Sequence, residues 1–137
     1  MSKKEDFDLN ATPRGELAIR TQAMPADTNP NGDIFGGWVL SHMDIAGGIV
    51  SCKRAKGRCV TVAVESMKFH RPVRVGDILC CYVEILNVGT TSIKTHIEAY
   101  ITQFNAETRI KVTEGTFIYV AIDDAGRPIP VTKDASS

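Results

Sequence analysis

Hydrophobic and polar positions along the chain predict one long helix. The segment DIFGGWVLSHMDIAGGIV, residues 33–50, is mostly apolar, is opened by two glycines and closed by two more, and carries a carboxylate, Asp44, near its middle. The preceding stretch PADTNPNGD is rich in turn-forming residues, so the chain should turn sharply before it enters the helix. We expect the helix to run from about Gly36 to about Ala55.

Five other segments have strand character. A weak signal lies in GELAIRTQAM before the helix, and stronger ones follow in RCVTVAVESMKFH, GDILCCYVEILNV, TTSIKTHIEAYITQF and TRIKVTEGTFIYVAI. The short connections between the last four predict antiparallel neighbours. The segment 90–104 alternates most clearly, which predicts a core face made of Ile93, Thr95, Ile97, Ala99 and Ile101 and a wetter face made of Ser92, Lys94, His96, Glu98 and Tyr100.

This order of elements predicts an α+β fold in which an antiparallel sheet of about five strands curves around one central helix. That arrangement is the hot-dog fold, although the pattern alone also permits another α+β sandwich. The 137 residues suit one domain. We expect a polar N-terminal segment at 1–14, the domain at 15–123, and a polar tail at 124–137 that lies loosely on the surface or is disordered.

Charge and composition narrow the function classes. Sixteen basic and sixteen acidic residues cancel, so no overall field attracts nucleic acid or an anionic membrane, and an anionic ligand needs a local basic cluster. The sequence has no signal peptide pattern and no apolar run of membrane-spanning length, so we expect a soluble, cytoplasmic protein. The four cysteines form no CxxC pair, and we expect reduced packing thiols and no metal site.

A helical projection places Asp44 in a strip of small and polar residues, comprising Gly37, Leu40, Ser41, Asp44, Gly47, Gly48 and Ser51. The other side carries His42 among apolar residues, and we expect that side to meet the sheet. Each glycine inside a helix costs about 1 kcal/mol relative to alanine. Gly47 and Gly48 therefore suggest that a partner subunit or a ligand approaches the backbone there. Alternatively, Asp44 is a solvated surface aspartate or the cap of a helix that begins at Ile45.

The remaining titratable candidates have simpler interpretations. Asp33 is placed to cap the helix, and His42 is expected to pack in the core. His70 and His96 have no partner that the sequence identifies. The chain has no GxSxG motif and no cysteine in a recognisable nucleophile setting. Asp44 is therefore the best-placed reactive side chain.

Two stretches resemble a known family. LAIRTQAMPADTNPNGDIFGGWVLSHMDIAGGIV and RCVTVAVESMKFHRPVRVGDILCCY are similar to bacterial acyl-CoA thioesterases of the YciA-like group in the hot-dog superfamily. The resemblance runs from about Leu17 to about Ile122, and DTNPNGDIFGGW, the MD of the helix and VTVAVESM are its most specific parts.

The resemblance implies hydrolysis of acyl-CoA thioesters with Asp44 as the catalytic carboxylate and Asn29 completing the site. Asp44 would act as general base on water or as a nucleophile that forms a mixed anhydride, and the sequence does not separate these routes. The resemblance also implies a homodimer with each active site at the subunit interface, assembled further into a homohexamer, a trimer of dimers. No cofactor is implied, because coenzyme A is part of the substrate and product.

Other parts of the substrate need their own contacts. Backbone N–H groups at the start of the helix, on Phe35, Gly36 and Gly37, are suited to stabilise an oxyanion. Two basic runs could hold the phosphates of coenzyme A, and they supply Lys53, Arg54, Lys56 and Arg58 in one and Lys68, Arg71 and Arg74 in the other. Alternatively, the first run complements the negative end of the helix dipole and is otherwise solvated. The segment Val60, Thr61 and Val62 resembles the family's wall along pantetheine.

Two other functions remain open. A non-catalytic acyl-CoA sensor would keep the groove and the basic cluster but would not need Asp44 or Asn29. A hot-dog dehydratase or hydratase would resemble a pattern with a catalytic histidine, and no histidine lies in the loop before this helix.

Overall fold

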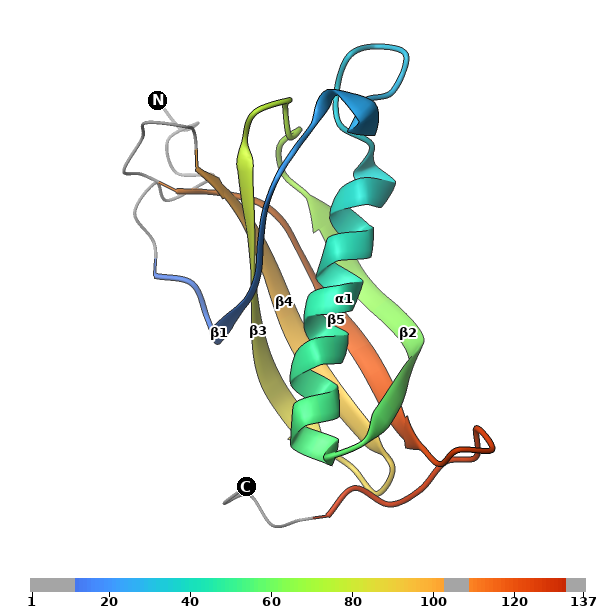
Figure 1. Cartoon of the computed structure of the whole chain (residues 1–137). Helices are drawn as coiled ribbons and strands as arrows, with labels where there is room; N and C mark the ends of the chain where they lie inside the picture. Colours follow the sequence, from blue (N-terminus) through green and yellow to red (C-terminus); the bar gives the residue numbers. More distant parts are fainter. Residues whose placement is uncertain (1–11, 103–108, 133–137) are drawn as a thin grey trace.

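The computed structural model describes residues 12–102 and 109–132 of the chain. It contains a long helix, a short 3-10 helix and five strands (Figure 1), which are β1 (Glu16–Gln22), η2 (Pro25–Asp27), α1 (Gly36–Ala55), β2 (Arg58–Phe69), β3 (Ile78–Val88), β4 (Ser92–Thr102) and β5 (Ile110–Ile122). The predicted helix bounds are confirmed, and each predicted segment contains one strand.

The strands form one antiparallel sheet in the order β1-β3-β4-β5-β2. The helix α1 lies lengthwise across one face of this sheet and contacts all five strands (Figure 1). This is the hot-dog arrangement that the order of elements predicts. β1 and β2 are the edge strands, so β2 pairs with β5 on one side and has a free edge on the other.

The core lies between α1 and the sheet. Val39, Met43, Ala46 and Val50 are buried on the helix, and Phe117 is buried on β5. The predicted core face of β4 is confirmed, because all five of its residues are buried: Ile93, Thr95, Ile97, Ala99 and Ile101. Burial of these alternating side chains fixes which face of β4 meets the helix.

The opposite face of β4 is less exposed to solvent than predicted, because Glu98 and Tyr100 are buried there. Glu98 accepts hydrogen bonds from the Tyr100 hydroxyl at 2.9 Å and the Arg14 backbone N–H at 3.1 Å, and its Oε2 lies 3.0 Å from His96 Nε2. Burial alone would raise the pKa of the Glu98 carboxyl. The hydrogen bonds, together with the charge of Lys111, outweigh this effect and lower that pKa.

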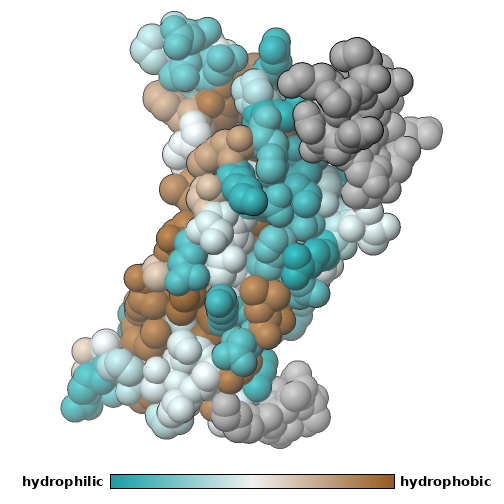
Figure 2. Space-filling model, turned by 180° about the vertical axis from the view of Figure 1, so that it is seen from behind, coloured by the Kyte–Doolittle hydropathy of each residue, from teal (hydrophilic) through white to brown (hydrophobic). Residues whose placement is uncertain are grey.

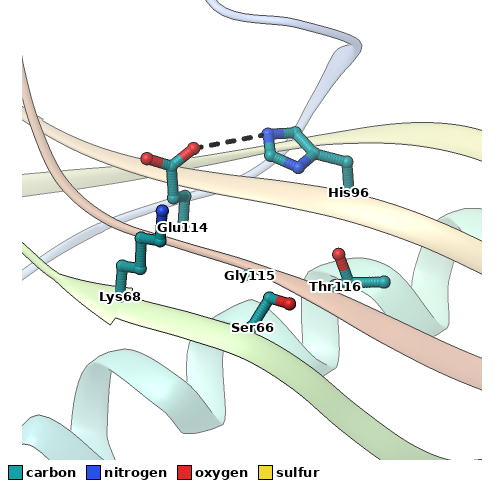
Figure 3. Close-up of a pocket in the computed structure, with 6 residues that line it drawn as sticks. All are labelled: Ser66, Lys68, His96, Glu114, Gly115 and Thr116. Atoms are coloured by element: carbon teal, nitrogen blue, oxygen red, sulfur yellow. Dashed lines mark ion pairs between the residues drawn. The ribbon is translucent and has the colours of Figure 1, made fainter.

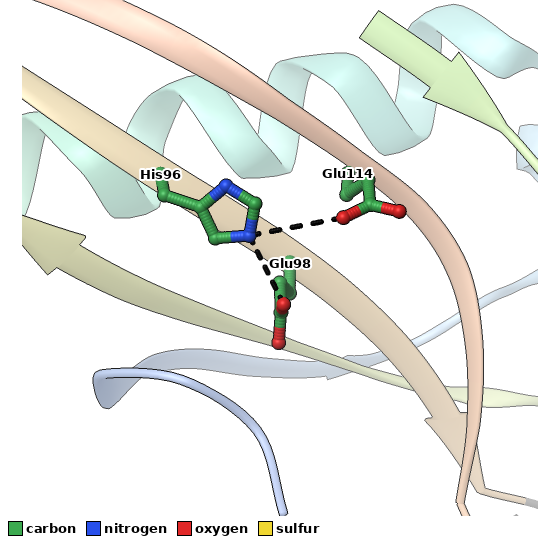
Figure 4. A group of neighbouring side chains, drawn as sticks. All are labelled: His96, Glu98 and Glu114. Carbon is green, nitrogen blue, oxygen red and sulfur yellow. Dashed lines mark hydrogen bonds and ion pairs between the residues drawn. The ribbon is translucent and has the colours of Figure 1, made fainter. Parts of the chain in front are cut away.

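A second carboxylate joins this group. His96 Nε2 lies 3.8 Å from Glu114 Oε1 (Figure 4). His70 Nε2 lies 2.8 Å from Glu114 Oε2. The Lys111 ammonium lies 3.3 Å from Glu98 Oε2 and 3.5 Å from Glu114 Oε1, so it supplies positive charge between the two carboxylates. Partners on neighbouring strands thus explain how the sheet buries charge here.

The segment after β5 is attached to the sheet up to Val131. Ile129 N–H donates to the Ala121 carbonyl, and Val131 N–H donates to the Thr90 carbonyl. Val131 is buried with Ile93 and Ala121 in a small second cluster. The prediction of a loose tail is therefore wrong for residues 128–131, while residues 1–11 and 133–137 lie outside the described residues. Within the described chain, no helix is long and apolar enough to cross a membrane.

The start of α1 also differs from the prediction. Its N-cap residue is Phe35, with no side-chain hydrogen bond to the helix. Asp33 lies two residues further upstream, too early to reach the free N–H groups of the first turn as a cap. The helix ends with Lys56 in the left-handed conformation, and the Lys56 N–H donates to the Cys52 carbonyl.

Candidate active site

Asp44 lies in the middle of α1 and meets hydroxyl groups from two strands. Thr61 on β2 donates a hydrogen bond to Asp44 Oδ1 at 2.6 Å. The Tyr119 hydroxyl on β5 lies 3.1 Å from the same Oδ1 and 2.8 Å from the Asp44 backbone carbonyl. Within the described part of the chain, Oδ2 accepts no hydrogen bond. The carboxylate therefore has one anchored oxygen and one that is free for chemistry.

The helical projection is correct for Val39, Met43, Ala46 and Val50, which are buried, but it is wrong at other positions. Gly47 and Ser51, assigned to the small-residue strip, are buried against the sheet, whereas Ile45 and Ile49, assigned to the core side, are half exposed. The helix is apolar on most sides, so its sequence could not decide how far around it the sheet reaches. Asp44 faces β2 and β5 at the boundary between the buried and the exposed sides.

Packing within the chain explains why position 47 is a glycine. A Cβ atom on Gly47 would lie 2.1 Å from the Tyr119 hydroxyl oxygen and 2.6 Å from Ile97 Cδ1. The expected close approach at Gly47 is therefore made by Tyr119, not by a partner subunit or a ligand. A Cβ on Gly48 would lie 3.9 Å from Tyr119 Cε2, which is an ordinary contact. Gly48 is not required by packing inside the chain.

Sequence reasoning missed the roles of Tyr119 and of the Thr61 hydroxyl. The two residues are directly opposite each other in the β2–β5 ladder. This register is set between segments about sixty positions apart, and the strand patterns do not contain it. Burial and the neighbouring Asp44 carboxylate both raise the pKa of the Tyr119 phenol, so it stays a hydrogen-bond donor.

Asn29 is held in the loop before α1. Its Oδ1 accepts hydrogen bonds from the N–H groups of Asn31 at 2.9 Å and Asp33 at 3.1 Å. Both partners are donors, so the orientation of the carboxamide is fixed. Among the described residues its Nδ2 makes no hydrogen bond, which leaves a donor available. This loop lies beyond the N-terminal end of α1 (Figure 1), whereas Asp44 is the ninth residue of the helix, so the loop that carries Asn29 and the turn that carries Asp44 are separated along α1.

The predicted oxyanion donors are also remote from Asp44. Phe35 N–H already donates to the Asp27 carbonyl at 3.2 Å, which leaves Gly36 and Gly37. Both glycines are exposed, and a Cβ on Gly37 would meet nothing within 4 Å. They precede Asp44 by seven and eight residues, or about 10–12 Å along the helix. Within one chain, these amides and the Asp44 carboxylate cannot reach the same carbonyl, which requires about 3 Å from each.

A model of the thioesterase superfamily matches residues 31–103, which is more than half of the chain. The chain belongs to the thioesterase superfamily. It is 54% identical over 126 residues to the acyl-CoA thioester hydrolase YciA of Salmonella typhimurium, covering 90% of this chain and 95% of the relative.

Solved structures extend this finding. The hexameric thioesterase y2039 from Yersinia pestis has a TM-score of 0.85 and 50% identity, over 89% of this chain and all of that chain. HI0827, a hexameric broad-specificity acyl-coenzyme A thioesterase, has a TM-score of 0.84 and 46% identity, over 90% of this chain and 86% of that chain.

The basic residues of this thioesterase lie in separate places. Arg54 and Arg58 are near the junction of α1 and β2, and Lys68 and Arg71 are at the other end of β2. A strand of this length spans about 40 Å, so the two groups cannot hold the same nucleotide within one chain. Arg54 Nη1 is buried without a hydrogen-bond partner among the described residues. That nitrogen is suited to receive an anion.

The second basic run does not form a single cluster. Lys68 lines a cavity on the face opposite α1, whose other lining residues are Ser66, His96, Glu114, Gly115 and Thr116 (Figure 3). Arg71 and Arg74 line a different cavity together with Pro72 and Asp77. The sequence run MKFHRPVR is therefore divided between two sites.

The free edge of β2 is apolar. Val60, Val62 and Val64 are all about half exposed on this strand, and Ile45 and Ile49 of α1 are also about half exposed. Figure 2 shows apolar atoms gathered along this side of the molecule. An unpaired strand edge with a contiguous apolar surface is typical of an interface with another chain.

Proposed function

We propose that the chain is an acyl-CoA thioester hydrolase in which Asp44 is the catalytic carboxylate. One observation supports the assignment of Asp44. The hydroxyl groups of Thr61 and Tyr119 contact Oδ1 of its carboxylate, whereas Oδ2 accepts no hydrogen bond among the described residues. The YciA relatives and the HI0827 thioesterase support the acyl-CoA substrate.

Oδ2 can serve either of two routes. As a general base, it removes a proton from water while the water oxygen bonds to the acyl carbon. The C–S bond then breaks, and the proton held on Oδ2 passes to the sulfur, so that coenzyme A leaves as a thiol and the acid is released. As a nucleophile, it bonds to the acyl carbon itself, the C–S bond breaks, and coenzyme A leaves as a thiolate that takes up a proton from water. Water then cleaves the resulting mixed anhydride, which releases the free acid and regenerates the Asp44 carboxylate. Both routes need negative charge on the carbonyl oxygen to be stabilised by donors about 3 Å away.

Those donors come from a second subunit in our proposal. The amides of Gly36 and Gly37 and the free Nδ2 of Asn29 are too far from Asp44 of the same chain, which favours a site shared across a dimer. The apolar edge of β2 and the exposed Ile45 and Ile49 support such a dimer. The relatives y2039 and HI0827 are hexameric, which supports a homohexamer built from three of these dimers.

A subunit-mixing experiment tests the shared site. Asn29→Ala and Asp44→Ala should each be nearly inactive alone. A mixed dimer collects both changes in one site and leaves the other native. With free exchange in an equal mixture, half of the dimers are mixed, so about a quarter of the wild-type activity should return by symmetry. The measurement is thiol release after co-expression or co-refolding, and absence of recovery despite proven exchange would place both residues in one subunit's site.

The wall and nucleotide contacts complete the proposal. Val60, Thr61 and Val62 would line the pantetheine arm from the edge strand. Arg54 and Arg58 are favoured over Lys68 and Arg71 for the phosphates of coenzyme A, because Arg54 Nη1 is buried and unpartnered.

Incubation with acyl-CoAs of short, long and aromatic acyl groups and a thiol reagent tests the function directly. We expect release of free thiol at a rate that depends on the acyl group. Tight binding without release would instead indicate an acyl-CoA sensor. A dehydratase would release no thiol, and it is disfavoured by the positions of the three histidines. His42 packs against Trp38, and His70 and His96 lie beside carboxylates on the opposite face of the sheet.

A further inference from the structure

We propose that Tyr119 is a positioning residue that fixes the Asp44 carboxylate so that Oδ2, and not Oδ1, is the reactive oxygen. This inference rests on the proposed function, and it assigns a role to a side chain on β5 that does not touch the substrate. The Tyr119 hydroxyl acts only through Asp44.

The geometry of the contact restricts Asp44 at two points. The Tyr119 hydroxyl oxygen lies 2.8 Å from the backbone carbonyl of Asp44 and 3.1 Å from its Oδ1. Both acceptors belong to the same residue and share the single hydrogen of the phenol, so one hydroxyl contacts both the side chain of Asp44 and its backbone. The Thr61 hydroxyl donates to Oδ1 from β2 at 2.6 Å. Rotation of the carboxylate would break both side-chain hydrogen bonds, so the two oxygens do not exchange roles.

The fold makes room specifically for this hydroxyl. Tyr119 is buried and its ring stacks on Phe117 with centroids 6.5 Å apart, a contact that a phenylalanine would make equally well. Apolar packing alone does not call for the phenol oxygen. The atom nearest to a Cβ at Gly47 is that oxygen, at 2.1 Å. A glycine within a helix thus accommodates the one atom of Tyr119 that reaches Asp44.

The hydroxyl also has an electrostatic effect. A hydrogen bond donated to a carboxylate favours its charged form, so removing it makes the carboxylate take up a proton at higher pH. Among the described residues, the other titratable group that acts on Tyr119 is Cys52 of α1. Thr61 on β2 contributes a hydroxyl that does not titrate near neutral pH. Loss of the phenol should therefore change the pH dependence of hydrolysis as well as its rate.

The test is Tyr119→Phe, with kcat and KM measured against pH on the best acyl-CoA found for the wild type. We expect kcat to fall roughly three- to tenfold, as for loss of one hydrogen bond. KM should change less than about twofold, because uniform binding is untouched. The acidic limb of the kcat profile should move to higher pH. Incorporation of 3-fluorotyrosine at position 119 keeps the hydroxyl but makes it a stronger donor, and it should move the limb to lower pH.

Tyr100→Phe is the matched control. Tyr100 is equally buried, and its hydroxyl donates to Glu98 Oε1 at 2.9 Å on the opposite face of the sheet. It should lose similar stability without any change in the pH profile. An active wild type with an unchanged profile in Tyr119→Phe, or an equal shift in Tyr100→Phe, would overturn the inference. If the wild type does not hydrolyse acyl-CoA, the proposed function fails, and the Asp44 carboxyl ¹³C chemical shift still tests the contact, because it should differ from the wild type in Tyr119→Phe and not in Tyr100→Phe.

Discussion

Asp44→Asn should lower kcat by a factor of about a hundred or more, because removal of a general base or nucleophile costs at least this much in comparable sites. The asparagine carbonyl can still accept the hydrogen bonds that Thr61 and Tyr119 donate to Oδ1. The amide nitrogen then replaces Oδ2 and can neither take up a proton nor attack a carbonyl carbon. Steady-state thiol release checks the rate, and circular dichroism and gel filtration check the fold and assembly.

The matched control for Asp44→Asn is Asp124→Asn. Asp124 is exposed in the turn after β5, and the same change of charge there should leave turnover unaltered. Turnover of Asp44→Asn within a few-fold of the wild type would remove Asp44 from the mechanism. Failure of Asp44→Asn to fold, with Asp124→Asn intact, would instead assign Asp44 a structural role.

Gly47→Ala should lower the stability of the folded chain, although alanine is a better helix former than glycine. Its Cβ would lie 2.1 Å from the Tyr119 hydroxyl oxygen and 2.7 Å from Tyr119 Cζ, and the Tyr119 ring is buried. Overpacking of this kind lowers the free energy of unfolding by about 1–3 kcal/mol. The helix propensity of alanine offsets about 1 kcal/mol of that cost. Urea denaturation, read as the shift in midpoint at constant slope, measures the difference.

Gly48→Ala provides the comparison on the next residue. A Cβ there would make an ordinary contact at 3.9 Å, so the folded chain should gain up to about 1 kcal/mol from helix propensity. Equal urea midpoints for Gly47→Ala and the wild type would contradict the packing argument. If Gly48→Ala reduces the number of subunits in the assembly but does not lower the stability of the chain, a partner subunit approaches the helix at that glycine.

Local patterns were sufficient to predict the elements of this fold. The bounds of α1 follow from an apolar segment that begins after a turn-rich stretch, and the core face of β4 follows from strict alternation. In these segments each residue's preference agrees with the final structure. The order of one strand, one helix and four strands then left few arrangements that bury the helix.

The site was harder to predict because its contacts are not local. Asp44 was found as an isolated carboxylate on an apolar helix, but its partners Thr61 and Tyr119 depend on the β2–β5 register. The exposed position of Ile45 depends on which side of α1 the sheet covers, and an apolar helix does not encode this choice. Burial of Glu98 likewise depends on Lys111 of β5 and on the Arg14 backbone N–H, and the spacing of these residues in the sequence does not show that they lie close together.

The strap formed by residues 128–131 limits how far the chain can be shortened. Val131 covers Ile93 and Ala121, and its N–H occupies the Thr90 carbonyl at the β3–β4 turn. A truncation after Ile122 would keep every strand, but it would expose the apolar side chains of Ile93 and Ala121 and would leave the Thr90 carbonyl without its hydrogen bond from Val131. Engineered versions that fuse this domain to another protein should therefore place the linker after Val131, since the strap belongs to the minimal folding unit.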